Sequence, residues 1–245
     1  MSPPPLFSIV IPVFNEAENI EPMVREIQAA FRGRTEPYEV IFVDDASNDD
    51  SPAVLQRLTL ETAGVVRSLH HRRNFGQSAA VGSGFRAARG EWIGTLDGDG
   101  QNDPAYIPAL IAALQSAGPS AGIAAGQRLG RKDTGFKKMQ SRIANAVRGR
   151  VLKDGTRDTG CGLKAFRRDV YLALPYFDAL HRFMPALVRR EGLEVVLVDV
   201  VDRPRLTGVS NYGFFDRLWV GILDLAGVWW LIRRRRSVPQ VREIA

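Results

Sequence analysis

Short apolar stretches alternate with amphipathic stretches along the first half of the chain. Apolar runs typical of buried strands lie within residues 7–13, 38–43, 65–69, 92–96 and 121–125. Hydrophobic residues recur at helical spacing in residues 17–31, 51–61, 77–88 and 105–115, and a long basic helix is expected over 136–152. Strands that alternate with helices, and that read as continuous apolar runs, indicate an open α/β sheet of buried strands.

One of these strands leads directly into two carboxylates. Asp97 and Asp99 follow the run that begins at Trp92, and Gln101 and Asp103 add oxygen atoms just downstream. Hard oxygen ligands of this kind favour Mg²⁺ or Mn²⁺. Asp-Gly is also ordinary turn chemistry after a strand, so the pair alone does not decide between a turn and a metal site.

A second strand ends in Asp44 and Asp45. The carboxyl edge of an open α/β sheet is where such folds bind ligands, so we expect these two side chains at a binding site. Residues 47–50 are polar as well, and for them a solvated turn with a helix cap is favoured over ligand contact.

The first strand leads into Asn15, which is spaced from Glu18 like a capping box, and Pro12 is expected to end the strand's hydrogen-bonded ladder. All three polar sets thus follow strands. The sequence therefore predicts one site at the carboxyl edge of the sheet.

Five segments that lie within residues 7–213 are, in chain order, IPVFNEAENI, VIFVDDASNDDS, RNFGQSAAVGSGFRAARGEWIGTLDGDGQNDP, DTGCGLKAFRR and DRPRLTGVSNYG. Together they resemble family 2 inverting glycosyltransferases of the dolichyl- or polyprenyl-phosphate mannosyltransferase type. The resemblance implies the nucleotide-diphosphosugar transferase (GT-A-like) fold, with a mostly parallel open sheet and flanking helices. It also implies transfer of a sugar, with GDP-mannose the expected donor, from a nucleotide diphosphate sugar to a polyprenyl phosphate lipid with inversion.

The same resemblance assigns residues to the donor and to a Mg²⁺ or Mn²⁺ cofactor. Asp99 is an expected catalytic residue. The metal ligands it implies are Asp97, Asp99 and Gln101. The donor-binding residues it implies are Pro12, Phe14, Asn15, Glu16, Asp44, Asp45, Asn74, Gln77, Asp97 and Gly98.

The acceptor phosphate is expected to meet Arg128, Arg142 and Arg205, of which Arg205 is also an expected catalytic residue. Gly208, Ser210 and Tyr212 match the family's closing loop, whereas Asn211 stands where the family pattern has a lysine. A phosphate acceptor is already largely ionised near neutral pH, so its transfer chemistry requires no strong general base.

Charge is distributed in agreement with this division. Residues 1–100 carry 9 basic and 14 acidic side chains, residues 101–202 carry 16 and 10, and residues 203–245 carry 8 and 3. Along the chain, the acids expected to hold the metal and the donor therefore come before the arginines expected to hold the acceptor. Nucleic-acid binding is not expected, because no nucleic-acid motif accompanies the basic region and the acidic strand ends would repel a phosphate backbone. Within that region, solvated helix faces are expected for Lys137, Lys138, Arg148 and Arg150.

Other features are given structural interpretations. The single cysteine, Cys161, excludes an intramolecular disulfide and is expected to be a packing residue in a reducing, cytosolic protein. Residues 1–6 do not have the pattern of a signal peptide. The glycines at 82 and 84 imitate a dinucleotide fingerprint but lie in a helical pattern, which favours close helix packing. His70, His71 and His181 do not suggest a zinc site.

The chain is expected to divide into a catalytic domain, residues 1–213, and an apolar C-terminal helix with a basic tail, residues 214–245. Charged residues interrupt the apolar run 214–232, so it falls short of the ~20 residues needed to span a bilayer. With the arginines at 233–236 it suits a membrane surface, which implies a peripheral protein on the cytoplasmic face. Packing onto its own domain, or onto a second subunit in a homo-oligomer, is the alternative.

Two other functions remain open at this point. A sugar nucleotidyltransferase would share the fold but usually carries a glycine-rich basic loop after the first strand, which residues 12–16 lack. A catalytically silent membrane adaptor would not need acids at three strand ends.

Overall fold

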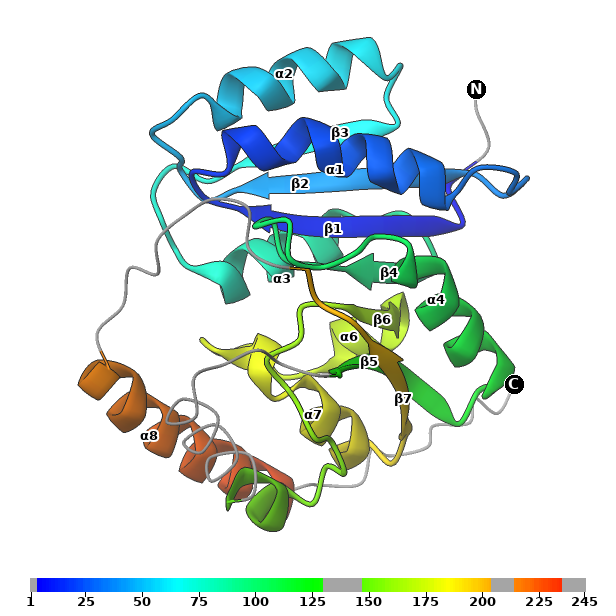
Figure 1. The fold of residues 1–245 in the computed structure, drawn as a ribbon. Coiled ribbons are helices and arrows are strands. Elements are labelled where there is room, and N and C mark those ends of the chain that lie inside the picture. The colour runs from blue at the N-terminus through cyan, green and yellow to red at the C-terminus, as the bar shows by residue number, and fades with distance from the viewer. Residues whose placement is uncertain (1–3, 130–146, 204–213, 235–245) are drawn as a thin grey trace, which may run out of the picture.

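The computed structural model describes residues 4–129, 147–203 and 214–234, with side chains of the last range from residue 221 onward. In these residues seven strands form one sheet in the order β3-β2-β1-β4-β6-β5-β7 (Figure 1). The strands are β1 Phe7–Val13, β2 Tyr38–Asp44, β3 Val66–His70, β4 Trp92–Thr95, β5 Ala121–Arg128, β6 Lys164–Arg167 and β7 Glu194–Val200. Only β6 runs antiparallel to its neighbours, so the expected mostly parallel sheet is confirmed.

Helices cover both faces of the sheet. They are α1 Ala17–Ala30, α2 Ser51–Glu61, α3 Gln77–Ala87, α4 Tyr106–Ser116, α6 Arg168–Ala173, the 3₁₀ turn η1 Leu180–Arg182, α7 Met184–Arg190 and α8 Phe214–Arg233. The apolar sides of α1, α2 and α4 form one core cluster, and those of α3, α6 and α7 form the other. Strand β1 contributes side chains to both clusters, because successive side chains of a strand point to opposite faces of the sheet. Ile9 and Ile11 belong to the first cluster and Val10 to the second.

The polar end of β1 differs from expectation. Pro12 lies inside β1, paired in register with Val43, and it lies beyond the last pair between β1 and β4, Val10 with Thr95. Because the pairing with β4 has ended before Pro12, the missing N–H of this proline leaves no β4 hydrogen bond unformed. The capping box is wrong: Glu16 is the N-cap of α1 and forms no side-chain cap hydrogen bond, while Asn15 has a positive φ of 58°.

The packing interpretation of the helical glycines is confirmed. Gly84 in α3 lies so close to β1 that a Cβ atom there would come within 2.3 Å of Val10 Cγ1. No side chain larger than hydrogen fits without separating α3 from the sheet.

The opposite, amino-terminal edge of the sheet contains a buried carboxylate. Glu39 accepts hydrogen bonds from Ser8 Oγ at 2.8 Å, Arg67 Nη1 at 2.6 Å and the Arg89 backbone N–H at 2.7 Å. These bonds join β1, β2, β3 and the end of α3, which stabilises the fold far from the strand ends that carry the expected site.

Arg148 does not lie on a solvated face, so that expectation is wrong. Its side chain is buried, lies 3.2 Å from Asp154 Oδ2 and donates to the backbone oxygen and hydroxyl of Thr156. The turn at Gly155, where φ is +73°, brings the Asp154 carboxylate under the guanidinium, and this local counter-charge makes burial feasible. Residues 147–152 are helical, and the rest of the expected basic helix, residues 136–146, lies outside the described residues.

Candidate active site

A pocket of about 330 Å³ opens where β1, β2 and β4 end, at the edge toward which the arrowheads of β1 and β2 point (Figure 1). It is lined by Pro12, Val13, Phe14, Glu16, Asp45, Asn74, Gly76, Gln77, Ala80, Asp97, Gly98 and Asp99. Most residues assigned to the donor thus lie around one cavity. Asn15, Asp44 and Gln101 do not line it.

Asn15 joins two loops. Its backbone N–H donates to Ser47 Oγ at 2.8 Å, and its side-chain oxygen accepts from the Asn48 N–H at 2.9 Å. These bonds fix the loop after β1 against the loop after β2, so Ser47 and Asn48 act as turn residues and cap no helix.

Asp45 is held by three donors. Its Oδ1 lies 2.6 Å from His71 Nδ1 and accepts from the Phe75 N–H at 2.9 Å, while Oδ2 accepts from the Gly76 N–H at 2.6 Å. Asp44 similarly accepts from the Ser47 N–H and faces His70 Nδ1, each at 3.2 Å. Both carboxylates therefore shape the loops around the pocket, and the two histidines have partners that the sequence did not suggest.

Asp97 is enclosed by neighbouring segments. Its backbone N–H donates to Asn102 Oδ1 at 3.0 Å, and its Oδ1 accepts from Gln77 Nε2 at 2.7 Å. A Cβ atom on Gly162 would come within 2.5 Å of the Asp97 carboxylate. Burial raises the pKa of Asp97 to about 6, with a further upward contribution from Asp99, and the positive charge of Lys164 opposes the rise.

The chemistry of this donor set fits a hard divalent cation. Asp97 and Asp99 line the same pocket, and a cation between them would favour the ionised form of Asp97, which burial and, to a lesser extent, the Asp99 charge oppose. Among the described residues, no three His, Cys, Asp or Glu side chains form a ready-made metal site. A site with one or two carboxylates is an ordinary one for Mg²⁺, which fills its other positions with water and substrate phosphate oxygens.

Arg128, at the end of β5, is paired with carboxylates. Its Nε and Nη2 donate to Asp158 at 2.5 and 3.0 Å, and its Nη1 donates to Asp202 Oδ2 at 3.2 Å. Asp202 in turn accepts from Asn102, the residue that holds the Asp97 backbone. Three of the five N–H groups of Arg128 are thus engaged, and the one that binds Asp202 links the end of β5 through Asn102 to Asp97.

The other expected acceptor ligands, Arg142 and Arg205, lie outside the described residues. So do the closing-loop residues Gly208, Ser210, Asn211 and Tyr212. Their assignments stay predictions.

A second cavity, of about 160 Å³, adjoins the first and shares Gln77 and Asp97 with it. Lys164, His181 and Arg182 line this cavity, and the sequence analysis had assigned none of them to a site. The one sequence signal that could have pointed to this cavity is Lys164, which stands between apolar residues in the segment that forms β6. Cys161 also lines it, and burial raises the pKa of its thiol to about 11, which fits a packing residue.

The chain matches the model of glycosyl transferase family 2 over residues 8–174. The chain belongs to that family. A dodecaprenyl-phosphate galacturonate synthase of Rhizobium johnstonii is 34% identical to it over 92% of this chain and 67% of that protein. An undecaprenyl-phosphate 4-deoxy-4-formamido-L-arabinose transferase of Serratia proteamaculans is 32% identical over 84% of this chain and 62% of that protein. The chain thus spans roughly three fifths to two thirds of these relatives' length, and the family expected from the sequence is confirmed.

Solved structures of two other enzymes support the fold. A glucosyl-3-phosphoglycerate synthase of Mycobacterium tuberculosis, in complex with Mn²⁺, UDP and product, has a TM-score of 0.68 at 16% identity, covering 93% of this chain and 80% of that one. A mannosyltransferase of Pyrobaculum calidifontis, in complex with GDP-mannose and Mn²⁺, has a TM-score of 0.63 at 19% identity, covering 97% and 67%. The expected GT-A-like fold of this family member is confirmed.

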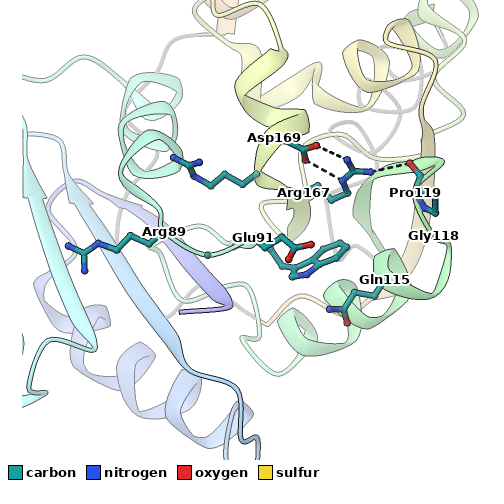
Figure 2. A pocket seen from close by; sticks show the side chains of 10 residues that line it. Arg89, Glu91, Gln115, Gly118, Pro119, Arg167 and Asp169 are labelled. Carbon is teal, nitrogen blue, oxygen red and sulfur yellow. Dashed lines mark hydrogen bonds and ion pairs between the residues drawn. The ribbon is translucent and has the colours of Figure 1, made fainter. Parts of the chain in front are cut away.

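A larger cavity, of about 700 Å³, lies at the other end of β4, beside Trp92 (Figure 2). Of the residues assigned to donor, metal or acceptor, none that the structure describes lines it. Figure 2 shows Arg167 between Asp169 and the Pro119 carbonyl oxygen, at 2.6 and 3.1 Å. This cavity is larger than the pocket at the carboxyl edge, but it is not where the sequence places the catalytic residues.

Proposed function

We propose that this protein transfers a sugar from a nucleotide diphosphate sugar to a polyprenyl phosphate, with inversion and with dependence on Mg²⁺ or Mn²⁺. The observation that carries the proposal is the pocket at the carboxyl edge, where side chains from the ends of β1, β2 and β4 and the start of α3 surround one cavity. The names of the relatives, which are polyprenyl-phosphate sugar transferases, support the acceptor class.

In this reaction an acceptor phosphate oxygen forms a bond to the anomeric carbon as the bond from that carbon to the diphosphate breaks. The nucleoside diphosphate leaves with the electron pair. A phosphate oxygen has its second pKa near 6, so the chain needs to position the acceptor and not to deprotonate it.

Asp97 and Asp99 would hold the cation, with Gln101 at the loop that follows. The cation would supply positive charge to the departing diphosphate. The chain itself positions the groups that line the pocket. Asp45 accepts hydrogen bonds from the backbone at residues 75 and 76, and Gln77 donates one to the Asp97 carboxylate. Both segments are therefore held in place before substrate binds.

Arg128, Arg142 and Arg205 are proposed to bind the acceptor phosphate, with Arg205 in the catalytic role. Guanidinium groups suit this task because they donate two parallel hydrogen bonds to phosphate oxygens. Arg128 would do so with the N–H groups that remain beyond its bonds to Asp158 and Asp202.

GDP-mannose remains the sequence-based prediction for the donor. The relatives are named for galacturonate and a formamido-arabinose, and the structural neighbours hold UDP or GDP-mannose, so both bases belong in the test. The purified chain is incubated with each nucleotide sugar, a short polyprenyl phosphate and Mn²⁺, and the lipid fraction is analysed by mass spectrometry. A sugar-phosphate lipid is expected, and its absence with every donor would contradict the proposal.

We further propose that α8 places the enzyme on the cytoplasmic surface of a membrane. One face of α8 packs on the domain through Val228, which is 1% exposed, while Trp229 and Trp230 are 40% and 55% exposed. Arg233 lies over the Trp229 ring at 4.0 Å, a combination of indole and cation that suits a lipid headgroup region. Within the described residues, no helix has the length and apolar content needed to cross a bilayer.

Replacing both tryptophans with serine tests this placement without disturbing the packed face. The double variant should sediment less with anionic liposomes and keep the melting temperature of the wild type. Equal sedimentation of the two proteins would instead favour a subunit contact, which size-exclusion chromatography with light scattering would detect as a homo-oligomer.

A further inference from the structure

The second cavity lies directly beside the donor pocket. Gln77 and Asp97 line both cavities, and the hydrogen bond of 2.7 Å between them forms the partition. At about 160 Å³ the second cavity has half the volume of the first, a space on the scale of one sugar ring. Because it adjoins Asp97, one of the two carboxylates proposed to hold the cation beside the diphosphate, a group attached to that diphosphate can reach it.

The wall of this cavity carries two cations. Lys164 is the first residue of β6 and pairs in register with Thr95, two residues before Asp97, and its side chain is only 5% exposed. Its ammonium donates to the Cys161 carbonyl oxygen, which accounts for one of three N–H groups. Arg182 lines the cavity from η1, and among the described residues it forms no salt bridge.

The lining of the cavity is net positive, with Lys164 and Arg182 against Asp97, and two acids outside the lining, Asp158 and Asp224, act on Lys164 and Arg182 respectively. Asp97 is the one acidic residue of its lining, and it is shared with the donor pocket. His181 lines the cavity too, with Nδ1 2.6 Å from Ser78 Oγ. Burial, together with the positive charges of Arg182 and Lys164, lowers the pKa of His181 to about 3, so the imidazole is neutral beside two cations.

We propose that this second cavity receives the transferred sugar, and that Lys164 and Arg182 select a sugar that bears a carboxylate over its neutral counterpart. This inference rests on the proposed transfer reaction. The buried Lys164 ammonium has one hydrogen bond and, among the described residues, no carboxylate in salt-bridge contact, so a carboxylate ligand would supply further acceptors and a direct counter-charge. A neutral sugar offers hydroxyl groups but no charge, so it compensates these cations less.

The acceptor phosphate is another anion that could reach these cations. A phosphate on a long isoprenoid chain has to approach with that chain attached, whereas Lys164 is almost fully enclosed between β4, β6 and the residues around Cys161. The enclosed position favours a small group carried in by the donor. The experiment below separates the two anions.

Calorimetric titration in the presence of Mn²⁺ compares three matched donor pairs: UDP-glucuronate with UDP-glucose, UDP-galacturonate with UDP-galactose, and GDP-mannuronate with GDP-mannose. The wild type should bind the acidic member of at least one pair about tenfold more tightly or better. Lys164→Met and Arg182→Gln should each lower that affinity about ten- to a hundredfold, the usual effect of losing a charged hydrogen bond. Arg182→Gln should leave the affinities for the neutral sugar and for the free nucleoside diphosphate unchanged. Lys164→Met also removes the charge that lowers the pKa of Asp97, so its loss of affinity for the acidic donor is measured relative to its affinity for the free nucleoside diphosphate.

Lys164→Arg keeps the charge and should keep the preference, which a purely structural role for Lys164 would not predict. Arg25→Gln, on the exposed face of α1, makes the same charge change away from the cavity and serves as the matched control. Arg182→Gln keeps the test decisive if the buried Lys164→Met variant does not fold.

Three results would overturn the inference. The wild type could show no preference for any acidic donor, or the variants could lose affinity equally for both members of a pair. The third result is a variant with unchanged donor affinity and a raised KM for the polyprenyl phosphate. The last would assign the cations to the acceptor. If no nucleoside diphosphate binds the wild type at all, the proposed function itself fails and this inference fails with it.

Discussion

Gly162→Ala should abolish most of the activity by displacing one carboxylate. A Cβ atom at this position would lie 2.4 Å from Asn102 Oδ1 and 2.5 Å from the Asp97 carboxylate. Ordinary contact between such atoms requires roughly 3.5 Å, so Asp97 or the loop around Gly162 has to move by about 1 Å.

Neither side chain can give way cheaply. Asp97 is held by Gln77, and Asn102 is held between the Asp97 N–H and Asp202. A displacement of about 1 Å in a positioned catalytic group can cost about a hundredfold in rate. Overpacking should also destabilise the fold by about 1 to 3 kcal/mol.

Gly149→Ala is the matched control, because beyond its own helix no described residue comes within 4 Å of the methyl group added at this helical glycine. It should unfold at the same or a slightly higher temperature, since alanine favours a helix over glycine by about 1 kcal/mol. Sugar transfer to a short polyprenyl phosphate and thermal unfolding are measured for both variants. If Gly162→Ala transferred sugar at the rate of the wild type, with unchanged dependence on Mn²⁺, the placement of Asp97 in the reaction would be refuted.

Three further outcomes are expected. Arg205→Ala and Arg142→Ala should raise the KM for polyprenyl phosphate about ten- to a hundredfold in steady-state assays and leave nucleotide affinity unchanged; an equal loss of nucleotide affinity would move them to the donor site. Glu39→Ala should lower the free energy of unfolding by about 3 to 5 kcal/mol in urea, because it leaves the Arg67 guanidinium without its buried partner; a loss below about 1 kcal/mol would contradict this. The pKa of His181 is lowered from 6.5 in the unfolded chain to about 3 in the folded protein, so the folded state binds fewer protons between these values. The free energy of unfolding should therefore be undiminished above pH 6.5 and fall by roughly 1 kcal/mol for each pH unit below it. His181→Gln should reduce this slope if the imidazole is its source.

The parts of the fold with strong local patterns were predictable. The expected helix over residues 51–61 coincides with α2, and the expected strand over 92–96 matches β4 to one residue. These segments carry their information in their own periodicity. The elements expected from periodicity did not include β6, α6, α7 and β7, and β6 is the antiparallel strand that only its pairing with β4 and β5 defines.

The site was predictable where a strand end reveals it. Asp97 and Asp99 followed from the apolar run before them, and both line the pocket. The partners that shape the pocket were not accessible in this way, because they are far apart in sequence: His71 is 26 residues from Asp45, and Asn102 is 100 residues from Asp202. Arg148 shows the same limit, since its helix position suggested solvent and only the fold brings Asp154 beneath it.

The measurement that tests the central claim most directly is calorimetric titration of UDP and GDP into the wild type and into Asp99→Ala, each with and without Mn²⁺. The account predicts that one nucleotide binds the wild type with Mn²⁺, binds far more weakly without it, and loses the Mn²⁺-dependent part of its affinity in Asp99→Ala while the melting temperature stays the same. Undiminished, Mn²⁺-dependent binding of the nucleotide to Asp99→Ala would contradict it.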